Sequence, residues 1–195
     1  MKFVIATKNQ HKLIEMQRIL LPMGIEAVID EDIGKTLTEP EENGVDFKEN
    51  ALIKARSACE ICGIPAIADD SGLCVDALGG APGIYSARYA GEHGNSKANN
   101  LKLLDALKDV EFEKRTGRFI SAIACVFPDG REFCVEGVCE GYIGFEEKGT
   151  NGFGYDPLFI SELGCFAELS AEDKDKISHR GKAMKVFKEE LKKYL

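Results

Sequence analysis

The sequence predicts a mixed α/β fold, and two observations carry that prediction. In the first part of the chain, short apolar segments with β-branched residues alternate with segments in which apolar residues recur at helical spacing. Further on, two strand-like segments flank Pro128-Asp129-Gly130, which is typical of a hairpin turn. Alternating strands and helices followed by a hairpin predict a sheet with both parallel and antiparallel strands.

The hydrophobic pattern predicts strand, helix, strand and helix in the first third of the chain. Capping-box spacing marks the start of the second helix, and proline and glycine mark the helix ends. These elements are a strand over residues 2–6, a helix with Leu13, Met16 and Leu20 on its apolar face that ends at Pro22, a strand over residues 24–29, and a helix from Asp46 and Glu49 to about Gly63.

The rest of the chain is predicted in the same way. Residues 65–68 form a short strand that leads into Asp69-Asp70-Ser71-Gly72, and the glycine-rich residues 79–94 are mainly loop. The remaining elements are a helix capped by Asn95 or Ser96 with Leu101, Leu104 and Leu107 facing inward, strands over residues 118–127 and 132–142, a loop over residues 149–156, and a helix from Ser178 through Leu191.

Composition limits the classes of function. The chain has 195 residues without repeats or linker-like stretches, so we expect a single domain over residues 1–195. A formal charge of −8 argues against binding of nucleic acid through bulk charge. No segment approaches the roughly 20 apolar residues of a membrane span, and no signal peptide is evident at the start. Seven cysteines without an export signal predict reduced thiols and a cytoplasmic protein. The Cys59-x-x-Cys62 pair is interpreted as small buried side chains.

The segment after the first strand, Thr7-Lys8-Asn9-Gln10-His11-Lys12, is a candidate phosphate site. A helix N-terminus presents backbone N–H groups that suit an anion, and Lys8 and Lys12 add positive charge. The glycines of a Walker A or dinucleotide motif are absent. An ordinary capped helix with exposed lysines remains an equal alternative.

Asp69 and Asp70 form the most informative pair. They follow a buried strand, and the carboxyl ends of strands line the ligand crevice of open α/β sheets. Adjacent carboxylates repel, so we expect Mg²⁺ to hold them, because it prefers carboxylate and phosphate oxygens. The alternative is an Asp-Ser-Gly turn with local backbone bonds.

The helix that starts near Asp46 carries a second polar group. Asn50 and Lys54 are four residues apart and share a helix face. A short amide at the start of an apolar helix body suits a polar site better than a core. The alternative is a solvated surface with a Glu49–Lys54 ion pair.

Two further segments are candidates for a pocket that holds a planar ligand. In the loop Gly149 to Pro157, glycines let the backbone approach a ligand, and Phe153 and Tyr155 could stack on a base. The alternative is a turn whose aromatic rings fill the core. Lys174 and the run Ser178-His179-Arg180 could donate hydrogen bonds to a base carbonyl or an oxyanion, or could form a charged helix cap.

Taken together and in this order, these segments resemble the inosine triphosphate pyrophosphatase family over Ala6 to Ala183. The most specific segments are Glu49-Asn50-Ala51 with Lys54-Ala55-Arg56, residues 68–73, Gly79 to Tyr89, Gly152 to Pro157 and Ile177 to Gly181. The resemblance implies Mg²⁺-dependent hydrolysis of ITP, dITP and XTP to the monophosphate and pyrophosphate. It also implies an elongated α/β fold with a long curved mixed sheet and flanking helices, two lobes around a cleft, and a homodimer.

The resemblance also implies roles for single residues. Asp70 is the expected proton acceptor, and Glu42 and Asp70 are the expected metal ligands. The residues expected to bind substrate are Thr7, Lys8, Asn9, Gln10, His11, Lys12, Lys54, Ser71, Phe153, Gly154, Tyr155, Asp156, Lys174, His179 and Arg180. Three alternatives compete: a Maf-like pyrophosphatase acting on other nucleotides, a nucleotide sensor without catalysis, and an RNA-binding module.

Overall fold

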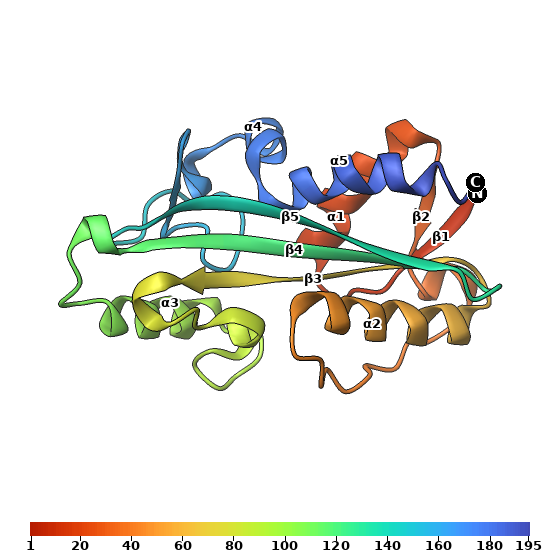
Figure 1. Cartoon of the computed structure of the whole chain (residues 1–195), viewed down its shortest axis with the longest axis horizontal. Helices are drawn as coiled ribbons and strands as arrows, with labels where there is room; N and C mark the ends of the chain where they lie inside the picture. The colour runs from red at the N-terminus through yellow and green to blue at the C-terminus, as the bar shows by residue number, and fades with distance from the viewer. The chain divides into compact units, whose positions relative to one another are not determined.

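The computed structural model describes residues 1–195 and contains one seven-stranded sheet with the order β2-β1-β3-β4-β5-β6-β7 (Figure 1). β1 pairs in parallel with β2 and β3, whereas β6 is antiparallel to β5 and β7. The predicted mixed α/β fold is therefore confirmed. The strands are β1 Lys2–Ile5, β2 Glu26–Val28, β3 Ala66–Val75, β4 Thr116–Val126, β5 Glu132–Ile143, β6 Phe159–Ser161 and β7 Gly164–Cys165.

Five α-helices accompany the sheet, and the four that the pattern predicts are present. The unpredicted one is the short α4. The helices are α1 Gln10–Leu20, α2 Phe47–Cys62, α3 Ser96–Ala106, α4 Ala171–Ile177 and α5 His179–Leu191. Short 3-10 helices are η1 Leu21–Met23, η2 Glu31–Ile33, η3 Asp76–Leu78, η4 Gly83–Arg88, η5 Phe112–Lys114 and η6 Phe166–Glu168. None of the helices has the length and apolar character needed to cross a membrane.

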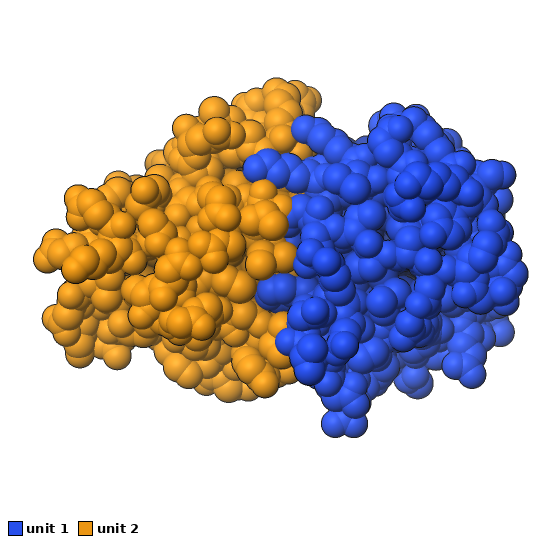
Figure 2. Space-filling view, in the orientation of Figure 1, with its two compact units in different colours: residues 1–70, 121–137, 180–195 blue, residues 71–120, 138–179 orange.

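The chain divides into two compact units, each built from several segments (Figure 2). Unit 1 contains residues 1–70, 121–137 and 180–195, and unit 2 contains residues 71–120 and 138–179. Strands β3, β4 and β5 contribute residues to both units. The single domain expected over residues 1–195 stays a prediction.

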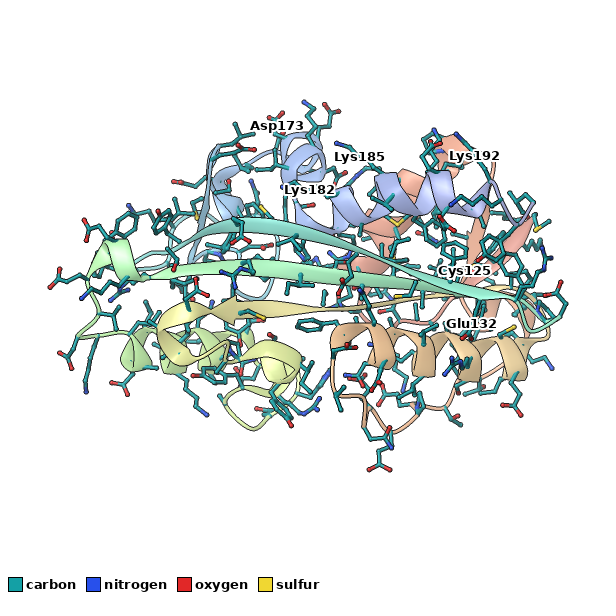
Figure 3. The ribbon with its side chains drawn as sticks, viewed as in Figure 1. Cys125, Glu132, Asp173, Lys182, Lys185 and Lys192 are labelled. Atoms are coloured by element: carbon teal, nitrogen blue, oxygen red, sulfur yellow. The ribbon has the colours of Figure 1, made fainter.

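In unit 1, helices cover both faces of the strands. α1 and α5 lie on one face and α2 on the other (Figure 1). α1 buries Leu13, Met16 and Leu20, the residues that the helical spacing selected. α5 buries an apolar face, while Lys182 and Lys185 project from its outer side and Lys192 follows its last residue (Figure 3). These faces meet β1, β3, β4 and β5 in one apolar core.

α2 packs differently, because its inward residues are small. Ala51, Ala55 and Ala58 are all buried, at helical spacing. Alanines let a helix backbone approach a sheet closely, so side chains at the edge of this face reach residues of β3. Lys54 is one of them, with its side chain 15% exposed.

In unit 2, the inward face of α3 is partly polar. The expectation that Leu101 faces inward is wrong. Leu101 is 60% exposed, whereas Leu103 and Leu107 are buried. The inward positions one turn earlier are taken by Asn99 and Asn100, which hold neighbouring loops by hydrogen bonds. Leu101 lies two residues from Leu103, about 200° around the helix, and so faces solvent.

No disulfide joins any of the seven cysteines. Cys59 is buried and Cys62 half-buried on α2, and burial raises the pKa of both thiols. A thiol with a raised pKa is a poor nucleophile and a poor metal ligand. The interpretation of Cys59 as a small buried side chain is confirmed, and Cys62 is less buried than expected.

Arg115 ties the segment after α3 to the end of β5 in unit 2. Its guanidinium is buried and donates to the carbonyl oxygens of Val110, Gly144 and Leu107 at 2.9, 2.9 and 2.7 Å. Three carbonyl oxygens therefore bind one guanidinium, although that of Leu107 also accepts from the N–H of Val110.

We expect Arg115→Met to lower the free energy of unfolding by about 2 kcal/mol or more, because it removes the guanidinium donor from the Gly144 and Val110 carbonyls and each orphaned buried carbonyl costs about 1–3 kcal/mol. The control is Arg118→Met. Arg118 is more exposed and pairs with Asp76 and Glu140, so its loss should cost about 1 kcal/mol or less. Urea unfolding of both variants measures the difference. Equal losses would contradict this account of Arg115.

Candidate active site

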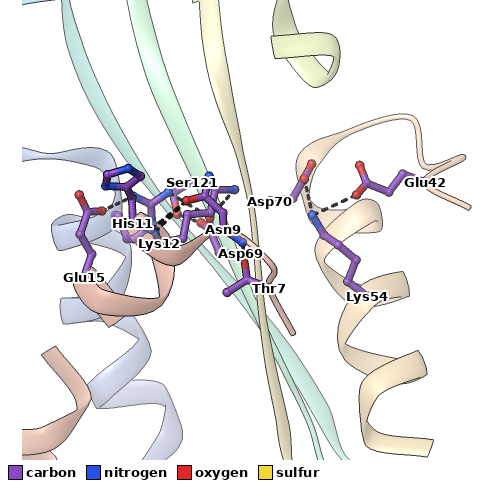
Figure 4. A network of polar contacts seen from close by, with 11 residues as sticks. Thr7, Asn9, His11, Lys12, Glu15, Glu42, Lys54, Asp69, Asp70 and Ser121 are labelled. Carbon is purple, nitrogen blue, oxygen red and sulfur yellow. Dashed lines mark hydrogen bonds and ion pairs between the residues drawn. The ribbon is translucent and has the colours of Figure 1, made fainter. Parts of the chain in front are cut away.

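The acidic pair lies within β3 and not after it. β3 continues from Ala66 to Val75, so the strand predicted to end at residue 68 is too short, and the Asp-Ser-Gly turn is absent. Successive side chains of a strand point to opposite faces. Asp69 therefore points toward α1, and Asp70 points toward α2 (Figure 4). Since the two carboxylates face different partners, a shared metal is not needed to hold them together.

On the α2 side, Lys54 joins two carboxylates. Its Nζ lies 2.6 Å from Asp70 Oδ1 and 3.5 Å from Glu42 Oε1 (Figure 4). Burial raises the pKa of Asp70, although the nearby lysines work to lower it. Burial also works to lower the pKa of Lys54, but Asp70 and Glu42 outweigh it and raise that pKa. This side chain is therefore a cation between two acids, and these contacts replace the Glu49–Lys54 pair of the alternative interpretation.

The donor chemistry of this group fits a divalent cation. Glu42 and Asp70 lie close enough to share one ammonium group. Mg²⁺ in nucleotide sites usually takes one or two carboxylates and completes its shell with water and phosphate oxygens. The chain holds no cluster of three His, Cys, Asp or Glu side chains arranged for a metal. Such a site would therefore depend on the phosphates of a bound ligand.

On the α1 side, Asp69 is the centre of a buried network. Its oxygens lie 2.9 Å from Lys12 Nζ, 3.0 Å from Arg180 Nη2 and 2.5 Å from Ser121 Oγ. Arg180 also contacts Glu15. Burial works against the charged carboxylate, yet Arg180 and Lys12 hold the pKa of Asp69 well below its usual range.

The segment at residues 7–12 is an ordinary helix cap in most respects. Asn9 is the N-cap of α1, and its Oδ1 accepts from the N–H groups of His11 and Lys12. Thr7 Oγ1 in turn accepts from the N–H of Asn9. Two backbone donors expected to meet a phosphate are thus already bonded, because the asparagine side chain supplies the acceptor locally.

The two lysines of this segment differ in position. Lys8 is exposed and pairs with Glu39 at 3.1 Å, whereas Lys12 reaches the buried Asp69. Gln10 is the first residue of α1. Lys12 is therefore brought to the acidic pair by a direct contact.

In unit 2, Asp156 and Lys174 build the loop predicted to hold a planar ligand. Their ion pair is buried at 2.8 Å, and Asp156 Oδ2 also accepts from the N–H of Phe153. A Cβ on Gly152 would lie 2.0 Å from that same oxygen, so glycine is required there. Lys174 Nζ lies 5.2 Å from the centre of the Phe153 ring.

The aromatic residues of this loop have different surroundings. Tyr155 is buried, and its hydroxyl donates to the carbonyl of Ser86 at 2.8 Å. Its ring fills the core of unit 2, as the alternative interpretation of this loop predicted, and a substrate contact by Tyr155 stays a prediction. Phe153 is half-buried. His179 is buried and stacks on Phe119, with ring centres 4.7 Å apart.

Comparison with known proteins shows the family of this chain. Residues 3–190 match the family model described as the Ham1 family. The chain belongs to the Ham1 family. It is 53% identical to a dITP/XTP pyrophosphatase of Haemophilus influenzae, over 97% of this chain and 98% of that protein. It is 52% identical to one of Desulforamulus reducens, over 98% and 96%. The resemblance predicted from the motifs is therefore confirmed.

Solved structures agree. A Ham1 protein from Coxiella burnetii superposes with a TM-score of 0.87 at 38% identity and covers 99% of both chains. A nucleoside-triphosphatase, dITP/XTP pyrophosphatase, from Mycobacterium abscessus gives a TM-score of 0.76 at 44% identity, over 96% of this chain and 97% of that one. The fold of this chain is the Ham1 fold.

Sequence reasoning missed two members of the Asp69 network in this Ham1 protein. Ser121 is the one polar side chain in the apolar segment 119–127, and that isolation is a usable signal. Glu15 has no such signal, because an acid on an amphipathic helix ordinarily faces solvent. The structure also places Ser71 on β3 directly after Asp70, half-buried.

We expect Asp69→Asn to destabilise this Ham1 protein by about 3–5 kcal/mol, because it removes the counter-charge of the buried Lys12 and one of the two acids that pair with Arg180. A lowered pKa in the folded state means that the Asp69 contribution is complete at neutral pH and is lost as pH falls. The stability difference between wild type and variant should therefore narrow below about pH 4.

Thermal and urea unfolding across pH measure this effect. The matched control is Asp76→Asn, an exposed aspartate that pairs with Arg118, for which we expect a change of about 1 kcal/mol or less. A fully stable Asp69→Asn protein at neutral pH would refute the role of Asp69 as the anchor of the network.

Proposed function

We propose that this Ham1 protein hydrolyses ITP, dITP and XTP to the nucleoside monophosphate and pyrophosphate, with Mg²⁺ as cofactor, and so removes non-standard purines from the nucleotide pool. The names of its relatives support this activity. The single structural observation that carries the proposal is the contact of Lys54 with both Asp70 and Glu42. It unites a candidate base, a candidate metal ligand and a candidate phosphate ligand in one group.

The reaction requires attack on the α-phosphorus. In our proposal Asp70 orients a water molecule and accepts its proton, the water oxygen bonds to the α-phosphorus, and the bond to the β-phosphate oxygen breaks. When bound, Mg²⁺ neutralises phosphate oxygens and the charge of the departing pyrophosphate. Glu42 and Asp70 are the side chains that would hold it. The raised pKa of Asp70 is favourable for a base near neutral pH.

The phosphate chain needs cations. Lys54 is the best placed, because it lies beside Asp70, and we expect it to move from the carboxylate to a phosphate when substrate binds. Lys12 is held by Asp69, and we expect it to contribute positive potential from that position. Thr7, Asn9, Gln10 and His11 stay predictions as phosphate contacts, and so does the exposed Lys8.

Base selection follows from hydrogen bonding. Hypoxanthine and xanthine present an acceptor at position 6, whereas adenine presents an amino donor. A pocket lined with hydrogen-bond donors binds the 6-oxo group of hypoxanthine or xanthine. It rejects adenine, because the adenine amino group would face another donor. In our proposal Phe153, Gly154, Lys174 and His179 contact the nucleoside, Ser71 remains a proposed substrate contact, and Asp156 holds Lys174 in place. Arg180 was expected to act as a base donor, but in the structure it binds Asp69 and Glu15.

We also propose a cytoplasmic homodimer that binds neither nucleic acid nor membrane. Seven thiols without a disulfide are typical of a reducing compartment. The charge of −8 disfavours a nucleic-acid partner. The homodimer rests on the resemblance alone, and sedimentation equilibrium of the purified chain tests it.

Asp70→Asn should lower ITP turnover by about 10²- to 10⁴-fold, because the amide cannot accept the proton. Nucleotide binding, measured by calorimetry, should persist. The matched control is Asp173→Asn, an exposed aspartate on α4 that pairs with Lys176, which should leave turnover unchanged. Wild-type turnover by Asp70→Asn would remove this residue from the mechanism. No release of pyrophosphate from ITP and Mg²⁺ by the wild-type chain would favour the sensor instead.

Among ITP, XTP, GTP and ATP, we expect ITP and XTP to be hydrolysed fastest and ATP slowest, because only ATP lacks the 6-oxo acceptor. The measurement is pyrophosphate release at equal nucleotide and Mg²⁺ concentrations. Fastest turnover of ATP would refute the donor-lined site, and a clear preference for pyrimidine triphosphates would favour the Maf-like alternative.

A further inference from the structure

Asn50 is a fully buried amide in α2, on the helix face that otherwise buries alanines. Its Oδ1 accepts a hydrogen bond from the backbone N–H of Gly44 at 2.9 Å. Because a backbone N–H can only donate, this contact fixes which side-chain atom is the oxygen. The other atom, Nδ2, is buried and has no hydrogen-bond partner.

Gly44 is required by space and not by backbone conformation. Its φ is not in the left-handed region. A Cβ there would lie 2.6 Å from Asn50 Oδ1 and 2.8 Å from both Asn50 N and Glu49 Cβ. The loop therefore rests directly on α2 at this residue. We name the contact of Gly44 with Asn50 the amide clasp.

Hydrogen bonds also fix the residues between the clasp and the start of α2. Asp46 caps α2 and accepts from the N–H of Glu49 at 2.8 Å, and Glu49 Oε2 accepts from the N–H of Val45 at 2.9 Å. This capping box fixes the entry into the helix. The clasp adds a hydrogen bond between α2 and Gly44, which lies nearer to Glu42 in the chain.

In the sequence, the residues of the clasp lie between Glu42 and its cation, Lys54. Glu42 precedes Gly44 by two residues, and Lys54 follows Asn50 by one helical turn. The clasp therefore joins the loop to the helix close to the point where Glu42 meets Lys54. An aliphatic side chain of similar volume would avoid an unsatisfied buried donor, so packing alone does not account for asparagine at this position.

We propose that Asn50 is a positioning residue, which sets the Glu42 carboxylate beside Lys54 and Asp70 and thereby sets the affinity of the site for a divalent cation. This inference rests on the metal role proposed for Glu42. Asn50 itself touches neither substrate nor metal. Partners that orient metal ligands typically change metal affinity by about 10- to 100-fold when they are removed.

The test is Asn50→Leu, which keeps the volume and removes the acceptor. Mn²⁺ binding is measured by electron paramagnetic resonance with a non-hydrolysable α,β-imido analogue of dITP, so no turnover is involved. We expect the Mn²⁺ dissociation constant to rise about 10-fold or more. Hydrogen exchange at the Gly44 amide should quicken without metal. Turnover at saturating Mg²⁺ should stay within about threefold of wild type, because Asn50 touches no reacting atom.

The matched control is Asn99→Leu. Asn99 is also a buried helix asparagine whose Oδ1 accepts from a loop N–H, that of Ala90, at 2.7 Å. It lies in unit 2, and its loss should reduce stability without altering Mn²⁺ binding. Gly44→Ala is a second route to the same effect if Asn50→Leu folds poorly, because the added methyl group lifts the loop while α2 stays intact.

A double-mutant cycle with Glu42→Gln separates the possible results. We expect Glu42→Gln to weaken Mn²⁺ binding, and Asn50→Leu to add nothing in that background. If Glu42→Gln has no effect, the proposed metal role of Glu42 fails, and this inference fails with it. If Glu42→Gln weakens binding but Asn50→Leu does not, or if the two effects add, the metal role stands and the positioning role of Asn50 is overturned.

Discussion

The site depends on the alternation of side chains along β3. Asp69 and Asp70 are neighbours in sequence, yet the strand directs them to opposite faces of the sheet. A buried carboxylate is stable only with a counter-charge or several donors. Each face must therefore supply its own cation. Lys12 on α1 serves Asp69, and Lys54 on α2 serves Asp70.

This requirement constrains how the helices of unit 1 pack. α2 brings Lys54 to Asp70, within β3, because inward residues such as Ala51 and Ala55 are small enough for a close approach. Asn50 is buried on the same helix, and the preceding loop rests on α2 so closely that Gly44 has no room for a side chain. Loop, helix and strand therefore form one polar group at this end of α2, and none of the three could shift without breaking an ion pair or a buried hydrogen bond.

Features that depend on the spacing of residues along the chain could be predicted from the sequence. Features that depend on contacts between residues far apart in the chain could not. The cap of α2 at Asp46 and the strands on either side of Pro128 follow from residues close together in the chain. Asp69-Asp70-Ser71-Gly72 has the composition of a turn, and only the neighbouring strands of the sheet make it part of β3. The sequence likewise left two alternatives for Tyr155, stacking on a base or filling the core, because its bond to Ser86 joins residues far apart in sequence. Asn50 was detectable, since an amide in an apolar helix is conspicuous.

The contrast between the two acids also explains why the geometry favours Asp70 as the base. Asp69 contacts two cations and a hydroxyl, which hold its pKa well below the usual range. Its carboxylate therefore stays charged and stabilises the fold. Asp70 has one lysine partner and a raised pKa. In the proposed mechanism a polyphosphate would compete for that lysine, and the released carboxylate would then accept the proton of water. Substrate binding and activation of the proposed base would thus be coupled, because both would depend on the position of the Lys54 ammonium group.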